Sequence, residues 1–218
     1  MPTSLLMICA RASGTTDEDA TDLHMLAAAI ELINVALMTH ASLPDDGPVV
    51  ENSPLLSMGQ AAGVLLGDCL YTRAFEMISR SRNALAIHEI AALTGHMVTA
   101  CTLERFPQAG HYVSQRNSSQ SLRGVVWSAC CSLGSRIAKG TDEQYDLLHE
   151  LGGLFALLWE RSAVPPLGKP DTARDVTSLV HTMSDTVVRA SEILSQALPA
   201  SRYRTALESL VTNLASPT

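Results

Sequence analysis

Apolar residues recur every three or four positions along most of the chain, and short polar segments separate the apolar stretches. Leu26, Ile30, Ile33 and Leu37 show this spacing, which places side chains on one face of an α-helix. The pattern predicts about eight helices and no sheet, so we expect an all-α protein. The expected helices cover residues 3–12, a long stretch from 16 to the break at 43–48, 57–79, 83–105, 121–139, 141–161, 172–198 and 201–214.

Local signals mark several of the expected helix ends. The acidic residues 17–19 stand at the start of the long helix, where the helix dipole favours negative charge. Pro44 and Pro48 end that helix, because proline lacks the N–H that the helical ladder needs. Thr141 and Gln144 form a capping-box pattern, which is typical of a helix start.

The composition fits one helical domain over residues 1–218. Apolar residues make up 46% of the chain and aromatic residues 4%, a mix that favours helix over sheet. A chain of 218 residues is long enough to bury a core. The formal net charge is −7 and no run of lysine and arginine occurs, which argues against nucleic acid or an anionic membrane as the main partner.

Neither a cysteine framework nor a targeting segment is expected. The five cysteines are an odd number without a Cys-x-x-Cys pair, so the sequence indicates no disulfide scaffold and no zinc site. The most apolar stretch, 26–38, is interrupted by Glu31 and Asn34, and no basic residue precedes the apolar residues 5–10. We therefore expect no transmembrane segment, no signal peptide and a cytoplasmic location.

Common catalytic motifs do not occur in the sequence. The segment 63–67 lacks the Gly-Lys-Ser/Thr ending of a phosphate loop, and no Gly-x-Ser-x-Gly is present. His88-Glu89 and His149-Glu150 each begin like a zinc protease helix, but neither has the second histidine. Spacing alone therefore predicts no catalytic residue and no metal ligand.

Four segments together resemble the trans-polyprenyl diphosphate synthases. Residues 26–34 match the A-A-x-E-L-I-H helix of that family, and residues 67–77 match its G-D-x-L-x-x-R-A-F helix. Residues 167–170 match its L-G-K-P loop, and residues 206–210 resemble its closing helix. The resemblance implies an isoprenoid synthase-like helical bundle. Because Met1-Pro2 falls on the family's R-P, the bundle is expected to be truncated at the N-terminus.

The chemistry of that family requires metal ions. An allylic diphosphate ionises, and two D-D-x-x-D motifs hold the Mg²⁺ ions that neutralise the departing diphosphate. The resemblance places the first motif at 41–45, where Ala41 and Ser42 replace the leading aspartates. A shifted frame begins with Asp45 and Asp46 but lacks the final aspartate, and Pro-Asp-Asp-Gly is a turn sequence. We therefore expect a degraded first motif.

The second motif and the basic residues also depart from the family pattern. The five positions of the second motif begin with Trp159, Glu160 and Arg161. A single glutamate beside an arginine does not replace two metal-binding aspartates. The family's K-T pair, which helps bind diphosphate, falls near Leu122-Arg123, so its lysine is missing.

These departures predict a pseudoenzyme, the small non-catalytic subunit of a heterodimeric polyprenyl synthetase in isoprenoid biosynthesis. It would support a catalytic polyprenyl diphosphate synthase subunit, influence product chain length and need no cofactor. In the family, the helix that matches 67–77 lies at the dimer interface. The expected interface residues, facing that partner or a second copy, are Leu66, Leu70, Phe75 and Met77.

Other interpretations of the same residues stay open. An apolar helix face does not reveal whether it meets the core of a monomer or a partner. The chain is alternatively a divergent, active short-chain synthase that uses Mg²⁺. Its ligands would then be Asp45, Asp46, Asp68 and Glu160. A third interpretation is a module that binds a prenyl chain or another lipid without chemistry.

Overall fold

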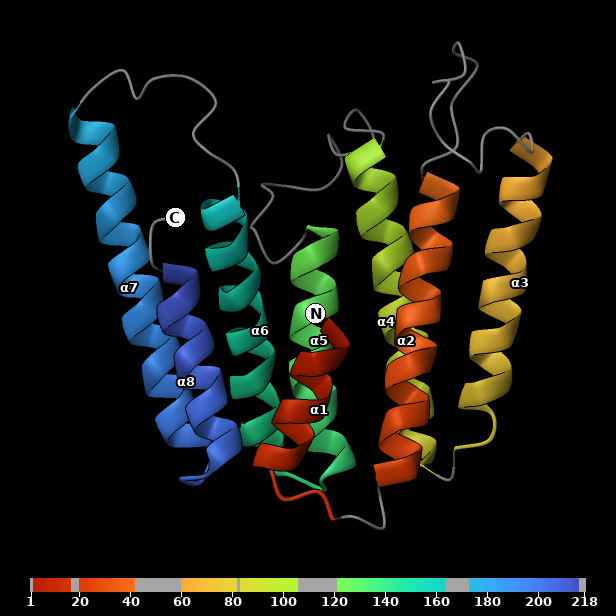
Figure 1. Cartoon of the computed structure of the whole chain (residues 1–218), viewed down its shortest axis with the longest axis horizontal. Helices are drawn as coiled ribbons and strands as arrows, with labels where there is room; N and C mark the ends of the chain where they lie inside the picture. Colours follow the sequence, from red (N-terminus) through yellow and green to blue (C-terminus); the bar gives the residue numbers. More distant parts are fainter. Residues whose placement is uncertain are drawn as a thin grey trace. The chain divides into compact units, whose positions relative to one another are not determined.

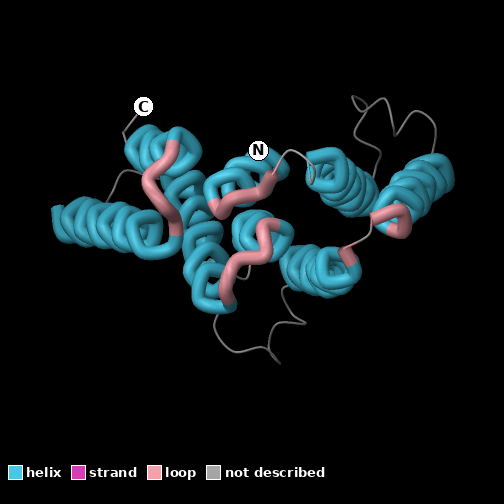
Figure 2. Tube along the Cα trace, turned by 90° about the horizontal axis from the view of Figure 1, so that it is seen from below, coloured by secondary structure: helices cyan, strands magenta, loops and turns pink. Residues whose placement is uncertain are grey.

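The computed structural model describes residues 2–16, 20–41, 60–81, 83–105, 121–163 and 173–215. Within these ranges the chain forms eight α-helices and no strand (Figures 1 and 2). The helices are α1 (Pro2–Ala12), α2 (Ala20–Ala41), α3 (Gln60–Ile78), α4 (Ala84–Arg105), α5 (Leu122–Ile137), α6 (Asp142–Ala163), α7 (Ala173–Ala197) and α8 (Arg202–Ala215). The all-α prediction is confirmed, and every predicted helix is present.

The chain divides into two compact units. Unit 1 consists of Met1–Asp17 and Gln115–Thr218, and contains α1 and α5 to α8. Unit 2 is Glu18–Ser114 and contains α2, α3 and α4. Whether the two units together form the single domain expected over residues 1–218 stays a prediction.

Helix α5 is the centre of unit 1. Twelve of its 16 residues are buried, and it packs against both α1 and α6. At Gly134 a Cβ atom would lie 2.8 Å from the backbone nitrogen of Ala10 and 2.8 Å from the carbonyl oxygen of Leu6. The absence of a side chain at this position therefore lets the α1 backbone approach α5 closely.

The capping box predicted at the start of α6 is confirmed. The backbone N–H of Gln144 donates to Oγ1 of Thr141 at 3.1 Å, and the backbone N–H of Thr141 donates to Oε1 of Gln144 at 3.1 Å. The Nε2 of Gln144 also donates to the carbonyl oxygen of Ala197 at 2.8 Å. One side chain thus satisfies an orphan donor of α6 and an orphan acceptor at the end of α7.

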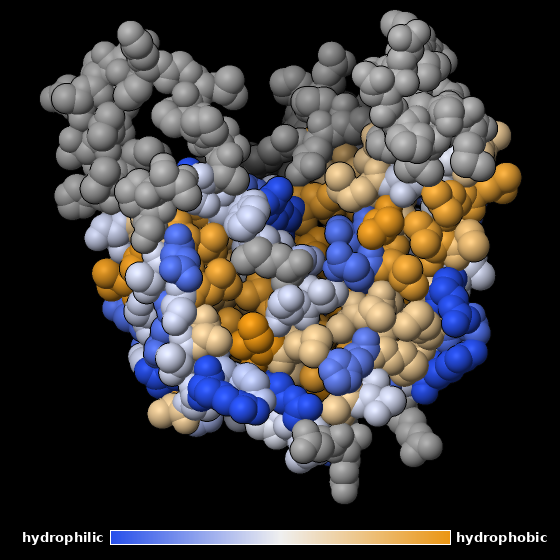
Figure 3. All heavy atoms as spheres, viewed as in Figure 1, coloured by the Kyte–Doolittle hydropathy of each residue, from blue (hydrophilic) through white to orange (hydrophobic). Residues whose placement is uncertain are grey.

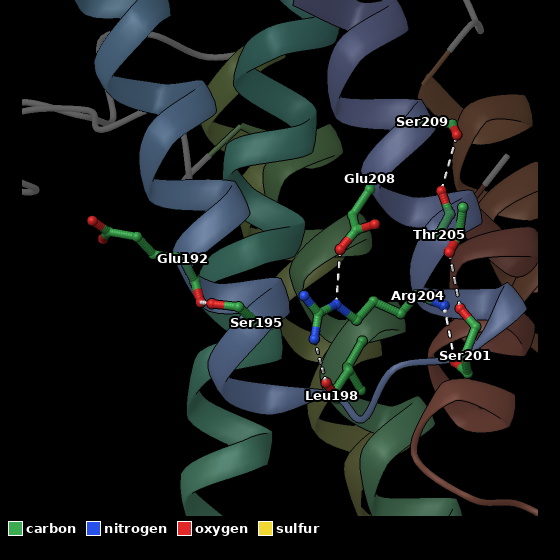
Figure 4. A network of polar contacts seen from close by, with 8 residues as sticks. All are labelled: Glu192, Ser195, Leu198, Ser201, Arg204, Thr205, Glu208 and Ser209. Atoms are coloured by element: carbon green, nitrogen blue, oxygen red, sulfur yellow. Dashed lines mark hydrogen bonds and ion pairs between the residues drawn. The ribbon is translucent and has the colours of Figure 1, made fainter.

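A turn that contains Pro199 separates α7 from α8 (Figure 4). The guanidinium of Arg204 donates to Oε1 of Glu208 at 2.8 Å and to the carbonyl oxygen of Leu198 at 3.2 Å. The backbone N–H of Arg204 donates to Oγ of Ser201 at 3.2 Å, so Ser201 caps the start of α8. The bond to Leu198 connects α8 to the residue that follows α7.

Unit 2 is built on α2, which packs against both α3 and α4. Helix α2 and residues 84–103 of α4 are long and apolar enough to cross a membrane, judged by length and composition only. In this structure 50% of the apolar window in α2 and 28% of that in residues 84–103 are buried. Two such helices do not by themselves indicate a membrane protein.

Two glycine substitutions test the close packing of α1 on α5. Gly134→Ala places a methyl group against backbone atoms of α1, which cannot move aside as a side chain can. We expect it to lower the free energy of unfolding by about 1–3 kcal/mol. Gly95→Ala in α4 is the matched control, because nothing lies within 4 Å of its Cβ position, and it should stabilise by about 0.5–1 kcal/mol. Denaturant unfolding measures both, and a neutral Gly134→Ala would contradict the close approach.

Candidate functional site

The structure describes the residues of the second degraded motif but only the first residue of the first motif. Ala41 is the last residue of α2, whereas Ser42, Asp45 and Asp46 lie outside the described residues. The L-G-K-P segment 167–170 also lies outside them. The expectations for the first motif therefore stay predictions. The second-motif residues are described, because they belong to the last turns of α6.

Glu160 is held by the N-terminal end of α5. Its Oε1 accepts a hydrogen bond from Oγ of Ser121 at 3.0 Å. The same Ser121 Oγ accepts from the backbone N–H of Gly124 at 3.0 Å and is the N-cap of α5. The carboxylate at the second-motif position thus stabilises a helix end together with its serine cap.

Aromatic and cationic side chains pack beside Glu160. The ring of Trp159 lies 5.9 Å from the ring of Trp127, with a tilt of 59° between the planes. The guanidinium of Arg123 lies 5.8 Å from the centre of the Trp159 ring, within the range of a cation–π interaction. Arg123, where the resemblance placed a diphosphate-binding lysine, therefore lies over a tryptophan of the second motif.

Helices α5 and α6 approach closely below this group of side chains. A Cβ atom at Gly152 would lie 2.4 Å from the carbonyl oxygen of Trp127 and 2.5 Å from Cα of Ser128. We call Ser121, Arg123, Trp127, Trp159 and Glu160 the α5–α6 cluster. Sequence reasoning did not find these contacts, since Ser121 and Glu160 are 39 positions apart and form no known motif.

The second-motif residues of this chain do not fit a magnesium site. Mg²⁺ takes oxygen ligands, and of Trp159, Glu160 and Arg161 only Glu160 supplies a carboxylate. The cations of Arg123 and Arg161 oppose the binding of another cation nearby. Within the part of the chain that the structure describes, no three His, Cys, Asp or Glu side chains are grouped so as to hold a metal ion.

The four expected interface residues all lie on α3 and are at least partly exposed. Leu66 is 39% exposed and Phe75 46% exposed, while Leu70 and Met77 are half-buried. Val64 and Leu65, which the sequence did not lead us to expect at the interface, are 43% and 68% exposed. Three consecutive apolar residues cannot all face the same side of a helix. The run 64–66 could therefore have indicated that α3 carries an apolar side chain outside its buried face. Figure 3 shows hydrophobic side chains gathered over the first half of α3, at the right of the view.

The second half of α3 carries an ion-pair network. Glu76 pairs with Arg73 one turn before it and with Arg80 one turn after it. Hydrogen bonding from Arg73, followed by the charges of both arginines, lowers the pKa of the Glu76 carboxyl. Arg73, the arginine of the R-A-F pattern, therefore has a partner on its own helix.

Ser121 substitutions test whether the α5–α6 cluster is structural. Ser121→Ala removes the helix cap and the donor to Glu160, and we expect a loss of about 1–2 kcal/mol in the free energy of unfolding. Glu160→Gln keeps an oxygen acceptor for Ser121 and should cost less than about 0.5 kcal/mol. The effect of Mg²⁺ on the melting temperature should be the same in wild type and Glu160→Gln. A Mg²⁺-dependent increase that Glu160→Gln abolishes would contradict the structural role.

Sequence comparison gives two curated archaeal relatives, and no family model matches the chain. Both relatives are named short chain isoprenyl diphosphate synthase. The protein from Methanocaldococcus jannaschii is 24% identical over 151 residues, which are 66% of this chain and 46% of the relative. The protein from Methanothermobacter thermautotrophicus is 30% identical over 92 residues, 41% of this chain and 27% of the relative. The chain thus aligns with less than half the length of either curated relative.

Structural comparison covers nearly the whole chain. Polyprenyl synthase from Caulobacter crescentus superposes with a TM-score of 0.74 and 18% identity, over 99% of this chain and 83% of that structure. A medium/long-chain prenyl pyrophosphate synthase from Arabidopsis gives a TM-score of 0.74 and 18% identity, over 99% and 88%. A geranyltranstransferase from Methanosarcina mazei gives 0.73 and 15%, over 98% and 82%. The chain therefore has the isoprenoid synthase fold, and the proteins similar to it in sequence and in structure are trans-prenyl diphosphate synthases.

Proposed function

We propose that the chain is a non-catalytic subunit of a heteromeric trans-polyprenyl diphosphate synthase. It supports a catalytic synthase subunit in the cytoplasm and influences the chain length of the product. The observation that carries this proposal is the α5–α6 cluster. At the second-motif positions, Trp159 contacts side chains of α5, and the single carboxylate already accepts a hydrogen bond from Ser121.

The physical argument is one of charge. A diphosphate carries several negative charges, and it leaves a substrate only when cations neutralise them. Two carboxylate clusters supply those cations in the trans-polyprenyl diphosphate synthases that this sequence resembles. Trp159 and Arg161 contribute no carboxylate here. A chain with this second motif therefore depends on another subunit for the ionisation step.

The exposed apolar side chains of α3 supply a surface for such a partner. Val64, Leu65, Leu66 and Phe75 together leave apolar area open to solvent on one helix. Exposed apolar side chains gathered on one helix are typical of a surface that contacts another protein. Burial of Leu65 and Phe75 against a partner would be favourable by roughly 1–2 kcal/mol for each side chain, since both are partly exposed in the single chain.

A second candidate is an active short-chain synthase. The names of both curated relatives favour it, since each is called a short chain isoprenyl diphosphate synthase. In that case Asp45, Asp46, Asp68 and Glu160 would supply the carboxylates for Mg²⁺. Glu160 and Asp68 belong to different units, and each already has a neighbour of its own, Ser121 and His40 respectively.

A turnover assay distinguishes these functions. The purified chain is incubated with Mg²⁺, isopentenyl diphosphate and an allylic diphosphate, alone and mixed with a catalytic trans-polyprenyl diphosphate synthase from the same genome. We expect no product from the chain alone, and an altered rate or product length in the mixture compared with the synthase alone. Product from the chain alone would instead support the active synthase. Binding of a fluorescent prenyl analogue without any turnover effect would support a lipid-binding module.

Charge substitutions test the partner surface. Phe75→Asp should weaken co-purification with the synthase subunit at least tenfold, because it places a carboxylate in an apolar contact. Val188→Asp in unit 1 is the matched control, since Val188 is also exposed, at 55%, and should leave co-purification unchanged. Asp45→Ala should also leave it unchanged. Loss of activity of the assembly in Asp45→Ala would contradict the assignment of Asp45 to a turn.

A further inference from the structure

His40, in the last turn of α2, lies directly over Gly67 of α3. A Cβ atom at Gly67 would lie 2.0 Å from Nε2 and 2.3 Å from Cδ2 of the His40 ring. Gly67 is buried and helical, and its φ is not among the positive values of the described residues. Backbone freedom therefore does not explain this glycine. Its missing side chain leaves the notch that holds the imidazole.

The imidazole contacts one face of α3. Its Nε2 lies 3.2 Å from the carbonyl oxygen of Val64 and 3.5 Å from Oδ1 of Asp68. A carbonyl oxygen only accepts, so Nε2 donates to Val64. The ring also lies 5.8 Å from the ring of Tyr71. Val64, Gly67, Asp68 and Tyr71 are spaced i, i+3, i+4 and i+7, so all four belong to the same side of the helix.

Tyr71 extends this contact toward the rest of unit 2. Burial raises the pKa of the Tyr71 hydroxyl, and the neighbouring Cys101 of α4 raises it further. The Tyr71 ring stacks with the ring of Phe75 one turn later, at 6.4 Å between centroids. The rings of His40, Tyr71 and Phe75 therefore form a continuous row, and Phe75 belongs to the proposed partner surface.

The opposite end of α3 is also tied to α2. Oγ of Ser81, just after α3, donates to Oδ2 of Asp22 in the first turn of α2 at 2.9 Å. Oγ of Ser81 also accepts a hydrogen bond from the backbone N–H of Asn83 at 3.1 Å. Two contacts thus link α3 to α2, the His40–Gly67 contact in the first half of α3 and the Asp22–Ser81 contact after its end.

We infer that His40 and Gly67 are a positioning pair, which sets the rotation of α3 on α2 and thereby the direction in which the exposed residues of α3 point. The buried residues of α3, Gly63, Gly67, Ala74 and Ile78, form one stripe against α2. Leu65 is two positions from Gly67 and lies on the far side of the helix. A rotation that removed the imidazole from its notch would turn Leu65 and Leu66 away from their present directions. The effect of this pair on binding to a synthase subunit rests on the proposed function. Its effect on the rotation of α3 does not, because both residues belong to this chain.

A double-mutant cycle on the single chain tests the pair. Gly67→Ala should lower the melting temperature by about 3–6 °C, because the methyl group expels the imidazole. In a His40→Ala background, the same substitution should no longer destabilise and should raise stability slightly, as expected for Gly95→Ala, since the clash is gone. His40→Gln, whose amide can donate to the carbonyl of Val64, should retain more stability than His40→Ala. Additive effects of His40→Ala and Gly67→Ala would overturn the inference.

Hydrogen exchange separates positioning from a general loss of stability. Gly67→Ala should increase exchange in peptides covering 60–78 more than in those covering unit 1. Gly134→Ala is the matched control, because it introduces a methyl group at a close contact in unit 1, and it should increase exchange in α1 and α5 but not in α3. Equal increases in both units for Gly67→Ala would count against the pair.

Binding to the synthase subunit supplies the last measurement. Gly67→Ala should weaken binding about tenfold. Gly134→Ala should weaken binding much less, although its melting temperature is similar. The double variant His40→Ala, Gly67→Ala should bind with the same affinity as His40→Ala alone. Binding unaffected by Gly67→Ala would overturn the link between the pair and the surface. If the wild-type chain binds no synthase, the proposed partner is wrong, while the thermal cycle and the exchange data still decide whether the pair positions α3.

Discussion

Close approach between helices at glycine positions is the constraint on which this structure depends. Gly134 admits the α1 backbone onto α5, Gly152 admits the α5 backbone onto α6, and Gly67 admits the His40 ring of α2 onto α3. The chain has few aromatic side chains to fill wide spaces between helices. Dispersion contacts fall off steeply with distance, so helices that approach closely recover packing energy that bulky side chains would otherwise provide.

The same packing explains how the second-motif region is used. Close contact of α5 and α6 at Gly152 places the start of α5 beside the end of α6. An acidic side chain is favourable near a helix N-terminus, and Glu160 takes that role through Ser121. Trp159 then fills the space between the helices with Trp127 and Arg123. Each of these contacts stabilises the fold, and the one carboxylate among them, Glu160, accepts a hydrogen bond from Ser121.

Helix type and position followed from the sequence because apolar spacing and caps act locally. The Thr141–Gln144 capping box joins residues three positions apart, so its hydrogen bonds could be predicted directly. The Ser121–Glu160 and His40–Val64 contacts join residues 39 and 24 positions apart, and they exist only after helices pack. Gly67 was recognisable as part of a motif, but its physical reason, the imidazole in its notch, required the arrangement of α2 and α3.

The exposed apolar side chains of the described residues are concentrated in unit 2. Eight of the nine exposed large hydrophobic side chains in the described residues lie on α2, α3 and α4, and one lies on α7. Unit 1 buries most of α5 and satisfies its helix ends with Gln144, Ser121 and Arg204. A partner would gain most by covering unit 2, because apolar area open to solvent is what association removes from water. This uneven distribution is what we would expect of the proposed non-catalytic subunit, in which unit 2 would contact the synthase.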